Sequence, residues 1–365
     1  MPQSEREESK STPTMDGYSS TRRDNSSRDN QRVSRAAQNT PTSMTEGKML
    51  SIIIVTWNCQ EEVMGCLKSL AELTESPLDI ETLVVDNDSQ DGTKEFLEAS
   101  SPHFSGIGLQ VMYNSKNLGL SNATQQAYQK AHGSWILLCN PDISFDSNFG
   151  QLVAYGYTHP NEIVVAEMIN NDGTPQKVIH RKFPTITRIF FDFTLVGTYL
   201  DEKFMNHLVR KDYCYQNERL PPVAAIEQPG ASFLLFNRIV IEKLGFIFDP
   251  SFPVWWNDVD LAMRAEEAGI RRILLSDVKV KHGLGGSGSR TMPSKTKRHV
   301  FCRSMILYAR RWKMRPRLLQ LLFCVDAILS VPLSTIIQRR TYGFFRALRR
   351  SIPHAAAQMS GVLGA

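Results

Sequence analysis

The chain has 365 residues, 42% of them hydrophobic, and a formal net charge of +5. This length accommodates one large domain or two ordinary ones, and the apolar content is enough for a core, which excludes a wholly disordered chain. A charge of +5 is mild over the whole chain, so its effect depends on where the basic residues gather. The six cysteines lack the spacing of a metal site, which favours reduced thiols in a cytosolic protein. A secretory signal pattern is absent from the N-terminal stretch.

Residues 1–48 are mostly Ser, Thr, Arg, Asp, Asn and Gln, with few aliphatic side chains. Such a segment cannot bury enough apolar surface to offset the entropy of ordering, and we predict a disordered tail. From residue 49 the pattern changes sharply.

Apolar runs then alternate with helical patterns. Strands are predicted at 50–56, 82–87, 109–114 and 135–139, with helices over about 60–73, 91–100 and 120–131. Runs that are apolar on both faces and alternate with helices indicate a parallel sheet covered on both sides. We therefore predict an α/β fold with a mainly parallel central sheet.

The predicted strands are followed by residues with polar groups: Thr56, Trp57 and Asn58 after the first, Asp86, Asn87 and Asp88 after the second, and Asn140 and Asp142 after the fourth. Ligands of such sheets bind beyond the carboxyl ends of the strands. The first turn contains neither the G-x-G-x-x-G nor the Walker A pattern, so a glycine-rich phosphate loop is excluded.

Asp142 ends the stretch "SWILLCNPD" (134–142). Pro141 fixes its φ angle and favours an extended Asn140, so the strand ends there and the Asp142 carboxylate projects past it. A carboxylate at this position can hold Mg²⁺ or Mn²⁺, which in turn can bind a diphosphate. A turn-capping aspartate is the equally weighted alternative.

A second segment, "WWNDVDLAMRAEEAG" (255–269), predicts a helix over about 258–268 with Asn257 as N-cap and Gly269 at its end. Asp258 then lies in the first turn, where the helix dipole favours the ionised form that a general base needs. Asp260 lies about 200° further around the helix, so only one of the two carboxylates can face a substrate. A purely structural role for Asp258 is the alternative.

The next predicted strand, 272–282, ends on His282 before a glycine-rich loop. A lone histidine is usually structural. One at the end of a strand is also a candidate metal ligand.

Five segments in order resemble the family 2 glycosyltransferases, in particular the bacterial rhamnosyl- and galactofuranosyltransferase branch. They are "LSIIIVTWN", "VVDNDSQDGT", "NLGLSNATQQAYQKAHGSWILLCNPD", "QPGASFLLFNRIVIEKLGFIFDPSF" and "WWNDVDLAMRAEEAGI" followed by "VKVKHGLGGSGS". The resemblance covers about residues 49–290. It implies a GT-A nucleotide-diphospho-sugar transferase fold and an inverting transfer from a nucleotide-diphosphate donor.

The resemblance also implies roles for particular residues. Asp258 falls on the catalytic base, and Asp142 on the last position of the Asp-x-Asp metal motif, with His282 as a second contact to Mg²⁺ or Mn²⁺. The nucleotide pocket and the acceptor side are implied at the remaining positions, namely Thr56, Asn58, Asp86, Asn122 and Asn140 for the nucleotide, and Gly230, Ala231 and Trp256 for the acceptor.

Two positions depart from the family pattern. Asn140 stands where many relatives carry a first aspartate, so metal binding depends on Asp142 with less negative charge. Asn257 replaces an acidic residue that often precedes the base, and we expect the loss of this like charge to lower the pKa of Asp258.

The predicted domains are a tail (1–48), a GT-A catalytic domain (49–300) and a basic amphipathic helical extension (301–365). The catalytic domain divides into a nucleotide-binding half (49–150) and an acceptor-side half (151–300). The expected function is a hexosyl- or deoxyhexosyl-type transfer to a hydroxyl of a glycan or lipid-linked acceptor in cell-surface polysaccharide biosynthesis. The alternative is a non-catalytic protein of the same fold that binds a sugar nucleotide or glycan.

The extension combines apolar stretches with dense Arg and Lys. Segment 318–337 is long enough to span a membrane but contains Gln320, Asp326 and Pro332, so we expect a helix in the membrane interface. A helical extension packed on the catalytic domain or on a second subunit is the alternative. Nucleic acid is not an expected partner, and the expected location is the cytoplasmic face of the cell membrane. The residues expected at the lipid surface are Arg310, Arg311, Trp312, Lys313, Arg315, Arg339, Arg340, Phe344, Phe345, Arg346, Arg349 and Arg350.

Overall fold

The computed structural model describes residues 49–73, 78–176, 178–215, 220–283, 292–342 and 344–365. The predicted tail (1–48) lies outside the described residues, as does most of the glycine-rich loop after His282.

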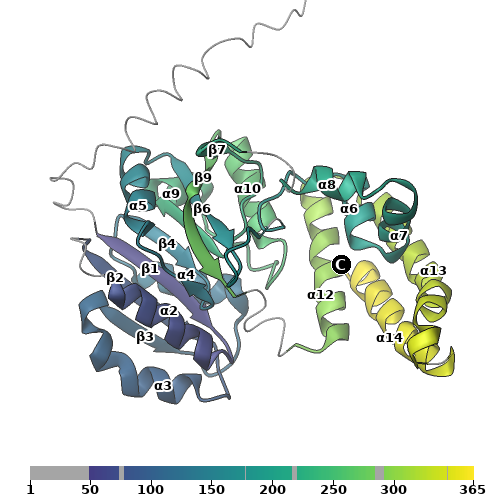
Figure 1. Ribbon diagram of the computed structural model, residues 1–365, viewed down its shortest axis with the longest axis horizontal. Helices are drawn as coiled ribbons and strands as arrows, with labels where there is room; N and C mark the ends of the chain where they lie inside the picture. Colours follow the sequence, from purple (N-terminus) through teal and green to yellow (C-terminus); the bar gives the residue numbers. More distant parts are fainter. Residues whose placement is uncertain (1–48, 74–77, 177, 216–219, 284–291, 343) are drawn as a thin grey trace, which may run out of the picture. The chain divides into compact units, whose positions relative to one another are not determined.

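The N-terminal half alternates strands and helices as predicted (Figure 1). β2, β1 and β4 carry β-branched and aliphatic residues on both faces and are almost fully buried. The elements are β1 (Leu50–Thr56), α2 (Gln60–Glu72), β2 (Ile80–Asp86), α3 (Thr93–Ser100), η1 (Ser101–Ile107), β3 (Leu109–Tyr113), α4 (Gly119–Lys130) and β4 (Trp135–Cys139).

The second half is less regular. Three short helices fill most of the long connection between β6 and β7. The elements are β5 (Ile143–Ser144), α5 (Phe149–Thr158), β6 (Glu162–Ile169), α6 (Ile186–Phe193), α7 (Leu195–Phe204), α8 (Leu208–Tyr213), β7 (Val223–Ala225), β8 (Phe233–Asn237), α9 (Arg238–Leu244), α10 (Asn257–Glu267) and β9 (Arg271–His282).

The strands form one sheet in the order β3-β2-β1-β4-β8-β6-β9-β5, and β7 also pairs with β9. The pairs among β3, β2, β1 and β4 are parallel, as predicted. Beyond β4 the sheet also contains antiparallel pairs, because β8 runs antiparallel to both β4 and β6. β9 is parallel to β6 but antiparallel to β5 and β7. The sheet is therefore mixed.

Helices cover both faces of the sheet (Figure 1). One core joins α2, α3 and α5 to side chains such as Ile52 and Ile54 of β1. The other joins α4, α9 and α10 to the opposite side of the same strands, including Ile53. This alternation along one strand is what a sheet buried on both faces requires.

The C-terminal region is helical, as predicted: α12 (Ser294–Arg311), α13 (Pro316–Tyr342) and α14 (Phe344–Leu363). α12 packs on the α/β part of the chain through a third core, in which Met305 and Tyr308 lie with Phe252, Trp256 and Val259. The alternative of a packed helical extension is therefore correct for α12.

Candidate functional site

A cavity of about 770 Å³ lies at the carboxyl ends of β1 and β4. Its volume is within the range of small-molecule sites. Eight of the eleven predicted site residues line it, which are Thr56, Asn140, Asp142, Gly230, Ala231, Trp256, Asp258 and His282. The carboxylates of Asp142 and Asp258, 116 positions apart in the sequence, thus face one space.

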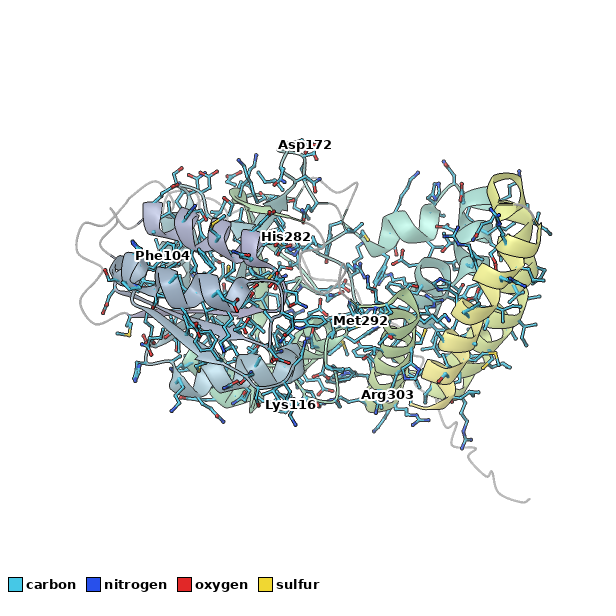
Figure 2. All side chains as sticks on the ribbon, turned by 90° about the horizontal axis from the view of Figure 1, so that it is seen from below. Phe104, Lys116, Asp172, His282, Met292 and Arg303 are labelled. Atoms are coloured by element: carbon cyan, nitrogen blue, oxygen red, sulfur yellow. The ribbon has the colours of Figure 1, made fainter. Side chains whose placement is uncertain are left out.

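Strand pairing brings Asp142 and His282 together. β5 begins directly after Asp142 and pairs with the end of β9, so Ile143 lies opposite His282. The Gly283 amide also donates to the Asp142 carbonyl oxygen (2.9 Å). His282 Nε2 consequently lies 3.4 Å from Asp142 Oδ1, and both side chains are buried. His282 is labelled in Figure 2.

Gln176 fixes which ring nitrogen of His282 carries the hydrogen in the neutral tautomer. Its Nε2 donates to the His282 carbonyl oxygen (2.6 Å) and to Asn170 Oδ1 (3.1 Å), which fixes the orientation of the amide. Gln176 Oε1 therefore accepts from His282 Nδ1 (2.8 Å). The lone pair of the neutral ring is then on Nε2, which faces Asp142.

Two electron-rich atoms that face one another at this distance fit a cation between them. Ligands that share one ion at bond lengths of about 2.1 Å lie about 3–3.4 Å apart. The hydrogen bond to Gln176 is the outer contact that orients a metal-binding histidine. Asp142 and His282 therefore fit a divalent ion. Among the described residues, no group of three or more His, Cys, Asp or Glu side chains gathers at one point, so further ligands would come from substrate or water.

Asp258 lies in the first turn of α10, as predicted. The N-cap is Trp256 rather than Asn257, with a left-handed backbone (φ 71°) that turns the chain sharply into the helix. Strain of this kind in a residue other than glycine is common at functional sites. Asp258 Oδ1 accepts from the Val259 amide (2.9 Å) and Oδ2 from Gln228 Nε2 (3.1 Å), which hold the carboxylate in position.

Asp260 occupies the other side of α10, as the helical spacing predicts. It is fully buried, and its carboxylate binds Arg264 Nε (2.9 Å), Arg311 Nε (3.1 Å) and Trp312 Nε1 (3.1 Å). Asp260 is therefore a structural residue, and Asp258 is the carboxylate that faces the cavity.

The pKa of Asp258 is raised, although residue 257 carries no charge. Burial raises the pKa of this carboxyl above its ordinary value, and the nearby Arg181 guanidinium only partly opposes the effect. Arg181 also lines the cavity, and its guanidinium carbon lies 5.5 Å from the ring centre of Tyr213 and 5.7 Å from that of Phe193. Desolvation by these surroundings outweighs the absence of an acidic residue at 257.

Gly230 is required by a close approach of two segments. A Cβ atom at this position would lie 2.6 Å from the side chain of Ile179 and 3.1 Å from its carbonyl oxygen. Gly230 and Ala231 thus allow the segment before β8 to form the cavity wall beside Gln228.

Three residues predicted to line the nucleotide pocket do not reach the cavity wall: Asn58, Asp86 and Asn122. Asn122 Nδ2 instead donates to the Leu118 carbonyl of its own helix (3.0 Å), and Asn58 Oδ1 accepts from the Gln90 amide. Asp86 is buried beneath the wall, where Oδ2 accepts from the Ser89 amide (3.2 Å).

Asn87 and Asn117 also line the cavity, and neither was assigned a role from the sequence. Asn87 Nδ2 donates to Asn117 Oδ1 (2.9 Å), while Asn87 Oδ1 accepts from the Leu118 amide (2.9 Å). The position of Asn87 directly after a strand was a usable signal. Asn117 lies in a loop that offered none.

Several buried polar atoms of the wall have no hydrogen-bond partner among the described residues. They are Gln228 Oε1, Trp256 Nε1 and Asn257 Nδ2. Because buried polar groups are almost always paired, these atoms are available to a bound molecule.

Comparisons with known proteins show what the chain resembles. Residues 51–217 match the family model described as "Glycosyl transferase family 2". The N-acetylglucosaminyl-diphospho-decaprenol L-rhamnosyltransferase of Mycobacterium tuberculosis is 22% identical over 262 residues, which are 69% of this chain and 81% of that protein. An uncharacterized glycosyltransferase of Mycoplasma genitalium is 28% identical over 97 residues, where the match spans only 33% of the relative.

Among solved structures, the crystal structure of GalNAc-T7 with UDP, GalNAc and Mn²⁺ aligns with a TM-score of 0.53 at 12% identity. The alignment covers 88% of this chain and 56% of that one. The fold is therefore the GT-A fold of sugar-nucleotide transferases. Residues 51–217, just under half of the chain, therefore resemble the family 2 glycosyltransferases.

Proposed function

We propose that this protein transfers a hexosyl or deoxyhexosyl group from a nucleotide-diphosphate donor to a hydroxyl of a glycan or lipid-linked acceptor. The observation that carries the proposal is the shared cavity, in which a pair suited to a divalent ion (Asp142, His282) and a carboxylate suited to a base (Asp258) face one space. The relative from Mycobacterium tuberculosis, whose name specifies a lipid-linked acceptor, supports this acceptor class.

Asp142 and His282 would hold Mg²⁺ or Mn²⁺. Such an ion neutralises the charge that develops on a leaving diphosphate. Gln176 Oε1 accepts a hydrogen bond from the Nδ1–H group of His282, which keeps the Nε2 lone pair directed toward Asp142.

Asp258 accepts the proton of the acceptor hydroxyl at a carboxylate oxygen. Its raised pKa makes it a stronger base than an ordinary aspartate. Gln228 and the Val259 amide fix its orientation, and the rings of Trp255, Trp256 and Phe301 in the cavity wall limit the access of water. A base on the side opposite the leaving diphosphate corresponds to a single displacement, which inverts the anomeric centre.

The place of action that we propose is the cytoplasmic face of the cell membrane, in the synthesis of cell-surface polysaccharide. Six free cysteines and the basic C-terminal helices support this location.

Donor binding tests the proposal directly. Purified protein is screened against a panel of nucleotide-diphosphate sugars by thermal unfolding, with Mn²⁺ and then with EDTA. A bound donor must stabilise the folded state, and we expect at least one sugar nucleotide to raise Tm only in the presence of metal. Asp142→Ala is expected to abolish the metal dependence, whereas Asp146→Ala, at a nearby exposed carboxylate, keeps it. An unchanged metal titration in Asp142→Ala contradicts the assignment.

A non-catalytic protein that binds sugar nucleotides or glycans is the second candidate. It is favoured by Asn140, which supplies an amide that donates to Ser232 Oγ (3.1 Å) in place of a second carboxylate. Slow hydrolysis of the stabilising nucleotide sugar with Mn²⁺ separates the two functions, because a binding protein releases no nucleoside diphosphate.

A further inference from the structure

The surface of α13 is not explained by sugar transfer. Within the part of the chain that the structure describes, one helix is long and apolar enough to cross a membrane, over Pro316–Ile336. Whether such a helix crosses a bilayer or lies on it depends on its faces. A spanning helix without partners is apolar all round, whereas an interfacial helix has one apolar face.

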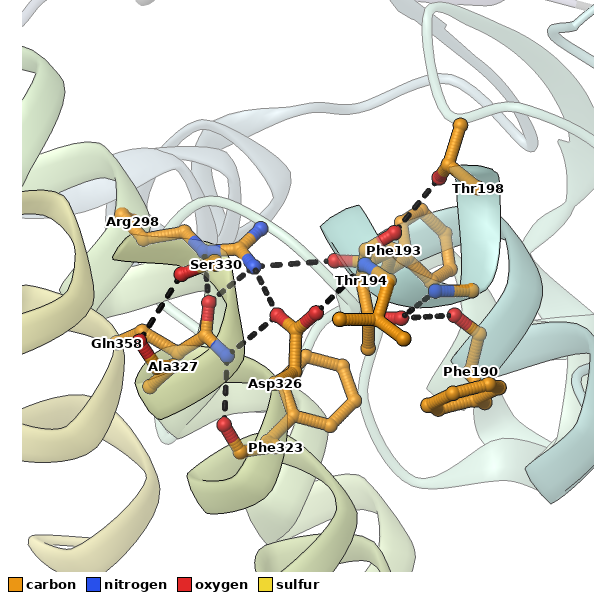
Figure 3. Close-up of polar contacts among 12 residues, drawn as sticks. Phe190, Phe193, Thr194, Thr198, Arg298, Phe323, Asp326, Ala327, Ser330 and Gln358 are labelled. Carbon is orange, nitrogen blue, oxygen red and sulfur yellow. Dashed lines mark hydrogen bonds and ion pairs between the residues drawn. The ribbon is translucent and has the colours of Figure 1, made fainter. Parts of the chain in front are cut away.

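One face of α13 is occupied by protein. Asp326 is buried, and its carboxylate accepts from the Val196 amide of α7 (2.8 Å) and from Gln358 Nε2 of α14 (2.9 Å). Arg298 of α12 lies 3.8 Å away. Figure 3 shows these contacts converging on Asp326 from three different helices. This side of α13 therefore packs against the protein and does not face lipid.

The opposite face of α13 is apolar and exposed. Six large apolar side chains are exposed among the residues of α13 whose side chains are described; at 100° per residue they fall within an arc of about 100°, centred about 150° from the buried face. They are Leu318, Leu321, Val325, Ile328, Leu329 and Ile336, with exposed fractions between 39% and 64%. A continuous apolar stripe of this size marks a contact surface.

Basic residues precede and follow this stripe in the sequence. Residues 294–365 contain 14 of the chain's 42 Lys and Arg but one of its 37 Asp and Glu, and that one is the buried Asp326. Exposed basic side chains precede and follow the stripe, namely Arg303, Arg310, Lys313, Arg315 and Arg317 on one side and Arg346 and Arg349 on the other. A second copy of the chain would bring like charges together, whereas a negatively charged surface would neutralise them.

We propose that α13 lies in the surface of an anionic lipid bilayer and does not cross it. The six apolar side chains of the stripe enter the boundary between head groups and acyl chains, and the flanking arginines and lysines contact lipid phosphates. Asp326 remains in the protein interior on the opposite face.

Two residues that were expected to contact lipid instead make contacts within the protein. Arg311 pairs with Asp249 and Asp260, and Trp312 donates to Asp260 and packs near Tyr308. The side chains of four further predicted residues, Arg339, Arg340, Phe344 and Phe345, lie outside the described residues.

Vesicle binding by the full chain tests this surface. Co-sedimentation is measured with vesicles of phosphatidylcholine alone and with vesicles containing phosphatidylglycerol, at low and high salt. We expect binding to the anionic vesicles that weakens with salt. The double variant Leu321→Glu/Ile328→Glu is expected to lose about tenfold or more in affinity, since each change places a charge in the lipid-facing stripe.

Lys68→Glu is the matched control, because it changes the net charge by the same amount at an exposed position of α2, away from α13 in the sequence. It should bind vesicles like the wild type. Metal-dependent Tm shifts with sugar nucleotides should be unchanged in all variants, which separates this proposal from that of sugar transfer.

Three results would overturn the proposal. The first is undiminished vesicle binding by the double variant. The second is a lipid-free dimer in sedimentation velocity that the double variant converts to a monomer, which would assign the stripe to a second copy. The third is resistance of the membrane-bound protein to alkaline carbonate extraction, which would indicate a spanning helix.

Discussion

At the scale of single residues, the site depends on neighbours that set the pKa of Asp258 and the orientation of the His282 ring. Asp258 is buried enough to raise its pKa, and Arg181 opposes that rise. His282 is held by one amide that leaves a single nitrogen facing Asp142. Each neighbour can be changed without removing the reacting group.

Replacement of Arg181 by Gln should move the pH profile of sugar transfer. The base works when deprotonated, so kcat/KM falls as pH drops below the pKa of Asp258. Loss of the guanidinium removes an effect that lowers this pKa, and the acidic limb of the profile is expected to shift to higher pH. Arg181→Lys retains the charge and should shift it less. A limb that stays in place, or moves to lower pH, would be inconsistent with this electrostatic role.

Replacement of Gln176 by Leu should weaken metal binding. The ring of His282 then loses the acceptor for its Nδ1 proton, and loss of such an outer contact lowers metal affinity by about 10- to 100-fold. Electron paramagnetic resonance of free Mn²⁺ during titration measures this without turnover. Gln176→Glu keeps an acceptor oxygen and should lose less. Wild-type Mn²⁺ affinity in Gln176→Leu would show that Gln176 does not support metal binding by His282.

The sequence predicted which charged residues converge but not which residues support them. Asp142, Asp258 and His282 each ended or began a recognisable element. Gln176 acts on His282 across 106 positions, and no local pattern marks that contact. Asn58, just after a strand, and Asn122, in the first turn of α4, were predicted at the cavity but bind nearby backbone instead. Their positions in the sequence do not reveal which way the side chain turns.

At the scale of elements, the site requires exact ends. β9 must extend to His282 to pair with β5, and the left-handed Trp256 must begin α10 so that Asp258 faces inward. Gly269 (φ +66°) follows the C-cap of α10 and stops the helix, as its sequence predicts. The cap at Trp256 could not be predicted, since a buried aromatic residue with positive φ has no sequence signature.

The helices of the C-terminal region are joined by the buried Asp326. Asp326→Ala should leave the partly buried Val196 amide without its acceptor and remove the carboxylate beside Arg298, and we expect a loss of about 1–3 kcal/mol of stability. Denaturant unfolding followed by circular dichroism measures it. Asp326→Asn, which keeps an acceptor, should lose less. Equal stability of Asp326→Ala and the wild type would contradict the structural role of this network.

At the scale of the whole molecule, the cavity draws its wall from both halves of the sheet and from the third core. Thr56 and Asn140 come from the parallel half, Gly230 from the mixed half, and Phe301 from α12. The parallel half was predictable because its strands and helices alternate locally. The antiparallel pairing of β4 with β8 joins segments about 100 residues apart, so periodicity alone could not give it.

The claim on which the account depends most is that Asp258 is the base in this cavity. The direct measurement is release of nucleoside diphosphate from the donor that stabilises the protein, for the wild type and for Asp258→Asn. We expect turnover to fall by about 10²- to 10⁴-fold while the Kd of the donor stays nearly constant. Undiminished turnover by Asp258→Asn would contradict the account.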